Sequence, residues 1–218
     1  MPKNYVSNKD ETVRMFENDF LEALSRVHWT VPLWLFIPII SFFMYEGFYV
    51  FSLPFMKSVF LIVFGLFVWT FTEYSLHRFV FHYQPKSNSG KRLHFIVHGV
   101  HHDYPKDSKR LVMPPSVSIP LASLFFILFN FLFSNANVFP FFAGFLIGYL
   151  FYDISHYAIH HFNMHSKFWL WIKNHHSKHH YQNPNLGYGV SQPTWDYVFG
   201  TAFSAKENSI QNETEQIK

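Results

Sequence analysis

Four long apolar stretches constrain the fold more than any other feature of this 218-residue sequence. They cover residues 29–51, 58–76, 116–133 and 137–157. Each approaches the roughly 20 residues that an α-helix needs to cross the hydrocarbon core of a bilayer. We therefore predict an all-α integral membrane protein with four transmembrane helices. Its parts are an N-terminal segment over 1–28, a membrane domain over 29–203 and a disordered tail over 204–218. Buried helices of a soluble protein are the alternative, which the length and apolarity of the stretches disfavour.

Short connections join these stretches in pairs, which predicts two helical hairpins with both chain termini on one side of the membrane. Pro54 and Lys57 lie in the first connection, and the sequence SNAN forms the second. Lysine and arginine gather in the other polar segments, and Lys57 alone lies near a hairpin tip. By the positive-inside rule, the termini and the middle loop are therefore cytoplasmic. The net charge of +3 is modest, so we interpret it as an orientation signal and expect no nucleic-acid partner.

Histidines are the second constraining feature, because all but His28 of the 15 fall into four clusters. The clusters are His77 and His82; His94, His98, His101 and His102; His156, His160, His161 and His165; and His175, His176, His179 and His180. Residues three or four apart share a helix face. This spacing allows convergence of His98, His101 and His102, of His156 and His160, and of His176, His179 and His180. Adjacent His101 and His102 lie about 100° apart on a helix, so the alternative is that segment 98–102 reaches two metals.

The pair His77 and His82 does not fit this rule. Five residues advance about 500° around an α-helix, which leaves the two side chains roughly 140° apart. Two interpretations remain open: the two histidines serve different metals, or the helix bulges between them.

This pattern predicts a metal centre, because imidazole is the commonest metal ligand in proteins. The chain has no cysteine, so nitrogen and oxygen are the available ligand atoms. One ion takes four to six ligands, so about ten histidines fit two ions, and zinc, copper, iron and nickel all accept imidazole. Asp103 and Asp153 adjoin clusters and are predicted to accept hydrogen bonds from the rings. A metal transporter is disfavoured, because few acids lie within the spans, and Glu46 and Glu73 are near their ends.

Three motifs resemble those of the membrane fatty acid hydroxylase and sterol desaturase superfamily: HRFVFH (77–82), HGVHHDYP (98–105) and HHSKHHY (175–181). The longer sequences RLVMPP, YDISHYAIHH and LGYGVSQPTWDYVFGT are similar to the fatty acid 2-hydroxylase branch. The likeness runs from about Phe20 to Thr201.

The resemblance implies a cytoplasmic helical cap that holds a dinuclear iron site, which uses O2 to hydroxylate C2 of a fatty acyl chain. The products would be 2-hydroxy fatty acids or 2-hydroxylated sphingolipids, and purified protein could contain zinc instead. Tyr152 and Asp153 match a pair that the family places near the substrate, and His175 is spare. The implied ligands are His77, His82, His94, His98, His101, His102, His156, His160, His176, His179 and His180.

The alternative within the superfamily is a sterol desaturase or a carotenoid hydroxylase-like enzyme. A site at the membrane interface favours attack near a lipid head group, but a sterol or carotenoid ring at the same depth would fit equally. Eukaryotic relatives often carry a fused cytochrome b5 domain, for which the segment before the first span is too short. We therefore expect a separate ferredoxin or cytochrome b5-like electron donor, and a bacterial inner membrane rather than the endoplasmic reticulum.

Overall fold

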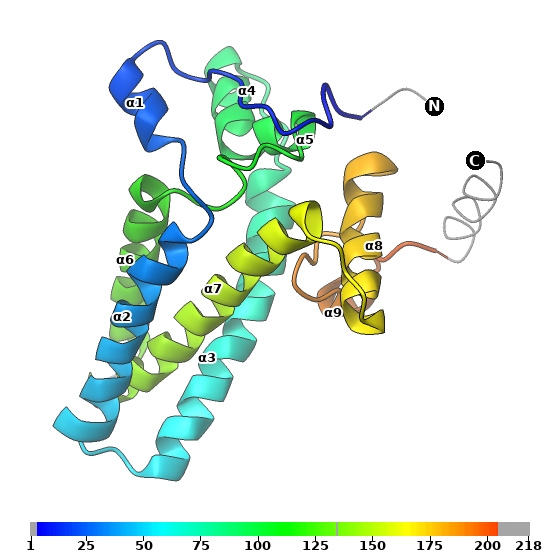
Figure 1. The fold of residues 1–218 in the computed structure, drawn as a ribbon. Helices are drawn as coiled ribbons and strands as arrows, with labels where there is room; N and C mark the ends of the chain where they lie inside the picture. The colour runs from blue at the N-terminus through cyan, green and yellow to red at the C-terminus, as the bar shows by residue number, and fades with distance from the viewer. Residues whose placement is uncertain (1–3, 134, 205–218) are drawn as a thin grey trace.

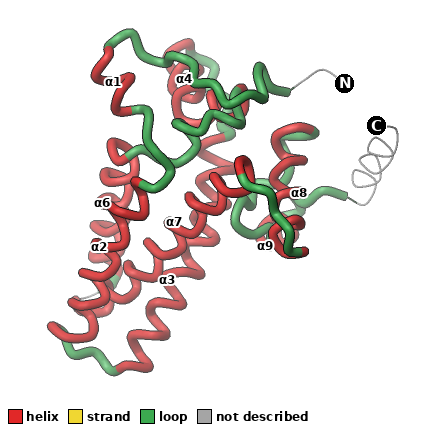
Figure 2. Tube along the Cα trace, in the orientation of Figure 1, coloured by secondary structure: helices red, strands yellow, loops and turns green. Residues whose placement is uncertain are grey.

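The computed structural model describes residues 4–133 and 135–204, and every regular element within them is a helix (Figure 2). Four helical segments are long and apolar enough to cross a membrane. They are α2 (Val31–Tyr45) with the π-helical turn η1 (Glu46–Val50); α3 (Phe55–Ser75) with the π-helical turn η2 (Leu76–Phe81); α6 (Pro115–Leu132); and α7 (Val138–His161). The prediction of an all-α protein with four membrane helices is confirmed. The predicted tail lies outside the described residues except for Ser204.

Helix α7 is the central helix of the membrane part, and it packs against α2, α3 and α6 (Figure 1). Its contact with α3 depends on two glycines that face each other's helix. A Cβ atom on Gly65 would lie 1.9 Å from the carbonyl oxygen of Phe141, and one on Gly144 would lie 1.9 Å from that of Ile62. Because lipid offers no hydrophobic drive for helix association, such close backbone packing is a main source of stability within a bilayer.

The remaining helices form a cap at one end of the four spans (Figure 1). The 3₁₀ turn η4 (Asn135–Asn137) precedes α7 at the opposite end. Side chains of Asn18, Ser87 and Ser166 accept hydrogen bonds from the first turns of α1, α4 and α8, which explains where these helices begin. The cap consists of α1 (Asp19–Leu24), α4 (Asn88–His94), the π-helical turn η3 (Phe95–Gly99), α5 (Val100–Asp103), α8 (Lys167–Tyr181) and α9 (Thr194–Val198).

Buried charges fasten the N-terminal segment to this cap. The carboxylate of Glu22, which is 5% exposed, accepts hydrogen bonds from the backbone N–H groups of Met15 and Phe16. It also pairs with Arg26 and with Arg110, and Arg110 donates in addition to the carbonyl oxygen of Val13. Segment 13–26 is therefore held against the connection between α5 and α6.

Candidate metal centre

The π-helical turn η2 brings His77 and His82 to the same place. The backbone N–H of His82 donates to the carbonyl oxygen of His77 at 3.1 Å, a bond that spans five residues instead of four. The wider turn compensates for the extra residue. Of the two interpretations left open by the spacing, the bulged helix is the one found.

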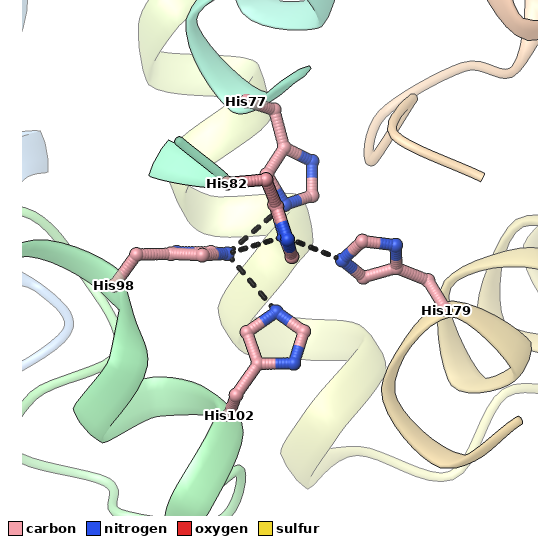
Figure 3. A group of neighbouring side chains, drawn as sticks. All are labelled: His77, His82, His98, His102 and His179. Carbon is pink, nitrogen blue, oxygen red and sulfur yellow. Dashed lines mark hydrogen bonds between the residues drawn. The ribbon is translucent and has the colours of Figure 1, made fainter. Parts of the chain in front are cut away.

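Two neighbouring groups of five histidines lie where the cap meets the ends of α3 and α7, and in each group one nitrogen per ring lies within 4.8 Å of the others. Figure 3 shows the first group, in which dashed lines join His98 to His77, His82 and His102, and join His82 to His179. The first group contains His77, His82, His98, His102 and His179. The second group contains His101, His156, His160, His176 and His180.

The two groups alternate along the helices. Histidines four residues apart share a group, as do His98 and His102, whereas His101 falls into the other group. In α8 the pair His176 and His180 likewise belongs to the second group, and His179 belongs to the first. Convergence of each triplet on one point is therefore wrong, and the alternative that segment 98–102 reaches two positions is the one found. The convergence of His156 with His160 is confirmed. In segment 98–102 and in α8, histidines four residues apart therefore belong to one group, and the histidine between them belongs to the other.

The donor set fits a bound cation. In the first group, Nε2 of His98 lies 3.0, 3.2 and 3.1 Å from the Nε2 atoms of His77, His82 and His102. A ring nitrogen carries at most one proton, so at most one of these three contacts can be a hydrogen bond. The others bring lone pairs together, which a cation would stabilise. Nitrogens 3.0 Å apart and about 2.1 Å from one ion subtend roughly 90° at that ion.

The second group has the same geometry. Nε2 of His176 lies 3.0 Å from Nε2 of His156, 3.1 Å from that of His160 and 3.0 Å from that of His180. The Nε2 atom of His101 is buried without a hydrogen-bond partner among the described residues. An unpartnered ring nitrogen beside four others is a ligand position, so this group could also hold an ion.

The electrostatics favour neutral rings, as metal ligation requires. Burial, reinforced by neighbouring histidines, lowers the pKa of His82 to about 2 and that of His102 to about 3. The same two causes hold the pKa values of His98, His101 and His180 well below the ordinary range. At neutral pH these rings therefore offer lone pairs and carry no charge that would repel a cation.

His94 lies outside both groups, although it was expected to be a ligand. The π-helical turn η3 begins directly after it, and its Nε2 atom is buried without a hydrogen-bond partner among the described residues. The spare histidine, His175, also lies outside the groups and contacts Asp196 at 3.0 Å. The structure brings together the other ten predicted ligands.

Two predicted acceptors have other partners. The carboxylate of Asp153 accepts hydrogen bonds from the backbone N–H of Met113 and from the hydroxyl of Tyr149, so its predicted contact with a ring N–H is wrong. Asp103 has no hydrogen bond to a histidine ring among the described residues, and its backbone carbonyl oxygen accepts from Val6 and Ser7.

The acceptors found lie on the segment 186–191, which sequence reasoning missed. The carbonyl oxygen of Tyr188 accepts from Nδ1 of His77, and that of Leu186 accepts from Nδ1 of His179 at 2.7 Å. Both contacts place the proton on Nδ1 and leave Nε2 free to bind a metal. Leu186 and Tyr188 belong to the motif LGYGVSQPTWDYVFGT, but the motif alone did not indicate that their backbone carbonyl oxygens accept from the histidine rings.

A largely apolar cavity of about 260 Å³ adjoins both histidine groups. His98 of the first group and His101 and His156 of the second lie in its wall, together with the predicted pair Tyr152 and Asp153. The apolar part of the wall includes Phe16, Leu24, Val97, Val117 and Leu121. An apolar cavity with a few convergent polar groups is the usual form of a small-molecule site.

Comparisons with known proteins agree with this architecture. The fatty acid hydroxylase family matches residues 62–201. The dihydroceramide fatty acyl 2-hydroxylase FAH2 of Arabidopsis thaliana is 37% identical over 199 residues, which cover 88% of this chain and 80% of that protein. The ceramide very long chain fatty acid hydroxylase SCS7 of Saccharomyces cerevisiae is 39% identical over 186 residues, which cover 84% of this chain and 48% of that protein.

A solved structure shares the fold. Full-length scs7p, of which only the hydroxylase domain is visible, superposes with a TM-score of 0.81 at 38% identity and covers 87% of this chain and 71% of that one. The matched part of the chain covers about half of the yeast relative, 48% of its length. These relatives come from a plant and a yeast, which argues against the expected bacterial inner membrane.

Proposed function

This chain belongs to the fatty acid hydroxylase family, and from that premise we propose that it hydroxylates a fatty acyl chain at C2 in an O2-dependent reaction. The products would be 2-hydroxy fatty acids or 2-hydroxylated sphingolipids. One observation carries the proposal: His98 of the first group and His101 of the second line the same apolar cavity. A substrate carbon in that cavity would lie beside both metal positions.

We propose two iron ions as the cofactor, one in each histidine group. Bound iron would supply the reductive activation of O2 that hydroxylation of an unactivated C–H bond requires. The reaction consumes O2, two electrons and two protons, and yields one C–OH group and one water. The proposed ligands are the ten members of the two groups, His77, His82, His98, His102, His179, His101, His156, His160, His176 and His180.

The protein's own part is to hold neutral rings in place and to keep water away. His98, His176 and His179 are at most 5% exposed, so solvent has little access to the positions between the rings. Excluding water strengthens electrostatic interactions and protects reactive species from side reactions.

The cavity would orient the substrate. Leu121, Val97 and Val117 would contact the acyl chain, because burial of apolar surface favours this arrangement. Tyr152 and Asp153 line the same cavity and directly precede the α7 histidines in the sequence. We propose that this pair contacts the polar end of the substrate, which would place C2 beside the metals.

For orientation, we propose that the termini and the metal centre face the cytoplasm. The support is the distribution of lysine and arginine, which are concentrated in the segments that form the cap. The eukaryotic relatives favour an internal membrane such as the endoplasmic reticulum over the bacterial inner membrane. The electrons would come from a separate donor such as a ferredoxin or a cytochrome b5-like protein.

Lipid analysis of a host tests this proposal. Membranes from cells with and without the gene would be compared by mass spectrometry, with the His98→Ala variant as the inactive reference and His28→Ala as the matched control. We expect 2-hydroxy fatty acids with the wild-type chain and with His28→Ala only. Hydroxylated carotenoids or altered sterols in place of 2-hydroxy fatty acids would assign the chain to another branch of the superfamily.

A further inference from the structure

Two histidines of the first group are oriented by one segment, 186–191, which approaches them from the side away from the metal position. Tyr188 and Leu186 supply the carbonyl oxygens that accept from Nδ1 of His77 and His179. Gly187 lies between them with φ of 72°, a left-handed conformation that side chains rarely adopt. A Cβ atom there would also lie 2.4 Å from the ring of Phe203, so the turn requires glycine.

The buried carboxylate of Glu73 holds one half of this segment. It is 3% exposed, and one oxygen accepts from the backbone N–H groups of Val190 and Ser191, each at 2.8 Å. Its other oxygen accepts from the hydroxyl of Ser191 at 2.5 Å. A buried carboxylate is strongly destabilising unless donors surround it, so this contact fixes the position of the segment relative to α3.

The carboxylate of Asp196 holds the other half. It is completely buried and accepts from the backbone N–H groups of Tyr188 and Gly189, each at 2.8 Å. It also accepts from the hydroxyl of Thr201 at 2.7 Å and contacts Nε2 of His175 at 3.0 Å. The two acids together bond four consecutive backbone N–H groups, from Tyr188 to Ser191.

Two histidines of the second group lack such support within the described part of the chain. The Nδ1 atoms of His176 and His180 are buried and have no hydrogen-bond partner among the described residues. In residues 4–133 and 135–204 no acceptor orients these two rings through Nδ1, whereas backbone carbonyl oxygens orient His77 and His179 in this way. The two metal positions therefore differ in how firmly their ligands are oriented.

We propose that Glu73 and Asp196 are positioning residues that act through segment 186–191 to orient the ligands of the first group, so that the two metals are held unequally. The inference rests on the proposed metal centre and adds a rank order: the first group binds its ion more tightly and loses it last to a chelator. Removing hydrogen-bond partners of metal ligands weakens metal affinity by about 10- to 100-fold. Loss of Glu73 should therefore weaken the first group selectively.

Metal content during a chelator titration tests this, measured by elemental mass spectrometry on the purified full chain. Two parent variants isolate the groups: His82→Ala/His102→Ala disrupts the first, and His156→Ala/His160→Ala disrupts the second. Glu73→Ala is then added to each parent. We expect it to weaken metal retention by about 10- to 100-fold where the first group remains, and by less than about twofold where the second remains.

Two further variants guard against a folding defect. Ser191→Ala removes one of three hydrogen bonds to Glu73 and should weaken the first group in the same direction but less. Glu46→Gln alters an acid in the first span, in the turn η1, and should leave both metals in place. Equal weakening of both groups, or no weakening of the first, would overturn the inference while two ions still bind. A wild-type chain that binds no transition metal would instead refute the proposed function, and this inference with it.

Discussion

Replacing Glu22 with glutamine should release the N-terminal segment from the cap while leaving both histidine groups intact. The carboxylate of Glu22 is the common partner of Arg26, of Arg110 and of the backbone N–H groups of Met15 and Phe16. None of these residues lies in either histidine group, but Met15, Phe16 and Arg110 line the cavity beside the metals. The variant should therefore lose activity without losing metal.

The expected magnitude follows from the burial of the pair. The side chains of Arg110 and Glu22 are 2% and 6% exposed. Removing one partner of a buried ion pair destabilises by about 3–5 kcal/mol, because the other charge stays buried without compensation. Glutamine still accepts one or two of the hydrogen bonds and Asp107 lies near Arg110, so we expect the lower end, about 3 kcal/mol. At this cost, the N-terminal segment of the variant should open roughly a hundred times more often than that of the wild-type chain.

The pH dependence has a defined sign. Burial raises the pKa of Glu22, but the N–H groups of Phe16 and Met15 and the two arginines outweigh it and lower the pKa from 4.5 to about 2. A lowered pKa means that the carboxylate stabilises the fold fully above pH 4.5 and loses this effect as the pH falls toward 2. The wild-type segment should stay closed down to about pH 4.5 and open below it, and the Glu22→Gln segment should show no such transition.

Hydrogen exchange of peptides from segment 13–26, read by mass spectrometry, measures this opening directly. Glu17→Gln is the matched control, since Glu17 is an exposed glutamate in the same segment. We expect faster exchange in Glu22→Gln alone, with the metal content of the wild-type chain in both variants. Unchanged exchange, or loss of metal along with faster exchange, would refute the reasoning.

Three other changes follow from the structure. His98→Ala should lower the metal content and His94→Ala should not, because His94 lies outside both groups; elemental mass spectrometry of both variants decides this. Leu121→Trp should shorten the preferred acyl chain, because each methylene group excluded from the cavity loses about 0.8 kcal/mol of burial, or roughly fourfold in kcat/KM. Activity measured on a series of acyl chain lengths tests this shift. An unchanged preference would show that the acyl chain lies elsewhere. Removing metal with a chelator should lower the Tm by about 5–10 °C, because ions at 100 times their Kd contribute about 2.7 kcal/mol to the free energy of unfolding. Thermal unfolding with and without chelator measures this difference, and equal Tm values would contradict the prediction.

The membrane part of the fold could be predicted from the sequence because hydropathy and helix length are local properties. All four predicted spans overlap the observed ones, from the stretch that became α2 to the one that became α7. The histidine clusters were equally visible, since each occupies a short run of residues. Local patterns therefore identified which residues belong to the site.

The arrangement of the site could not be predicted, because it depends on departures from ideal helices and on distant contacts. The π-helical turn η2 brings His77 and His82 into one group. Glu73 contacts Ser191 across 118 residues of sequence. A regular α-helical projection contains neither kind of information, although it does show that adjacent His101 and His102 face different directions.

The measurement that tests the account most directly is hydroxylation under isotopically labelled O2. Purified wild-type chain with iron, a reducing system and an acyl lipid substrate should give a product with the label at the C2 hydroxyl, and His98→Ala and His101→Ala should give none. Mass spectrometry of the product and its fragments locates the label. A hydroxyl derived from water, a label at another carbon, or full activity in either histidine variant would contradict the proposal that the two histidine groups activate O2 beside the cavity.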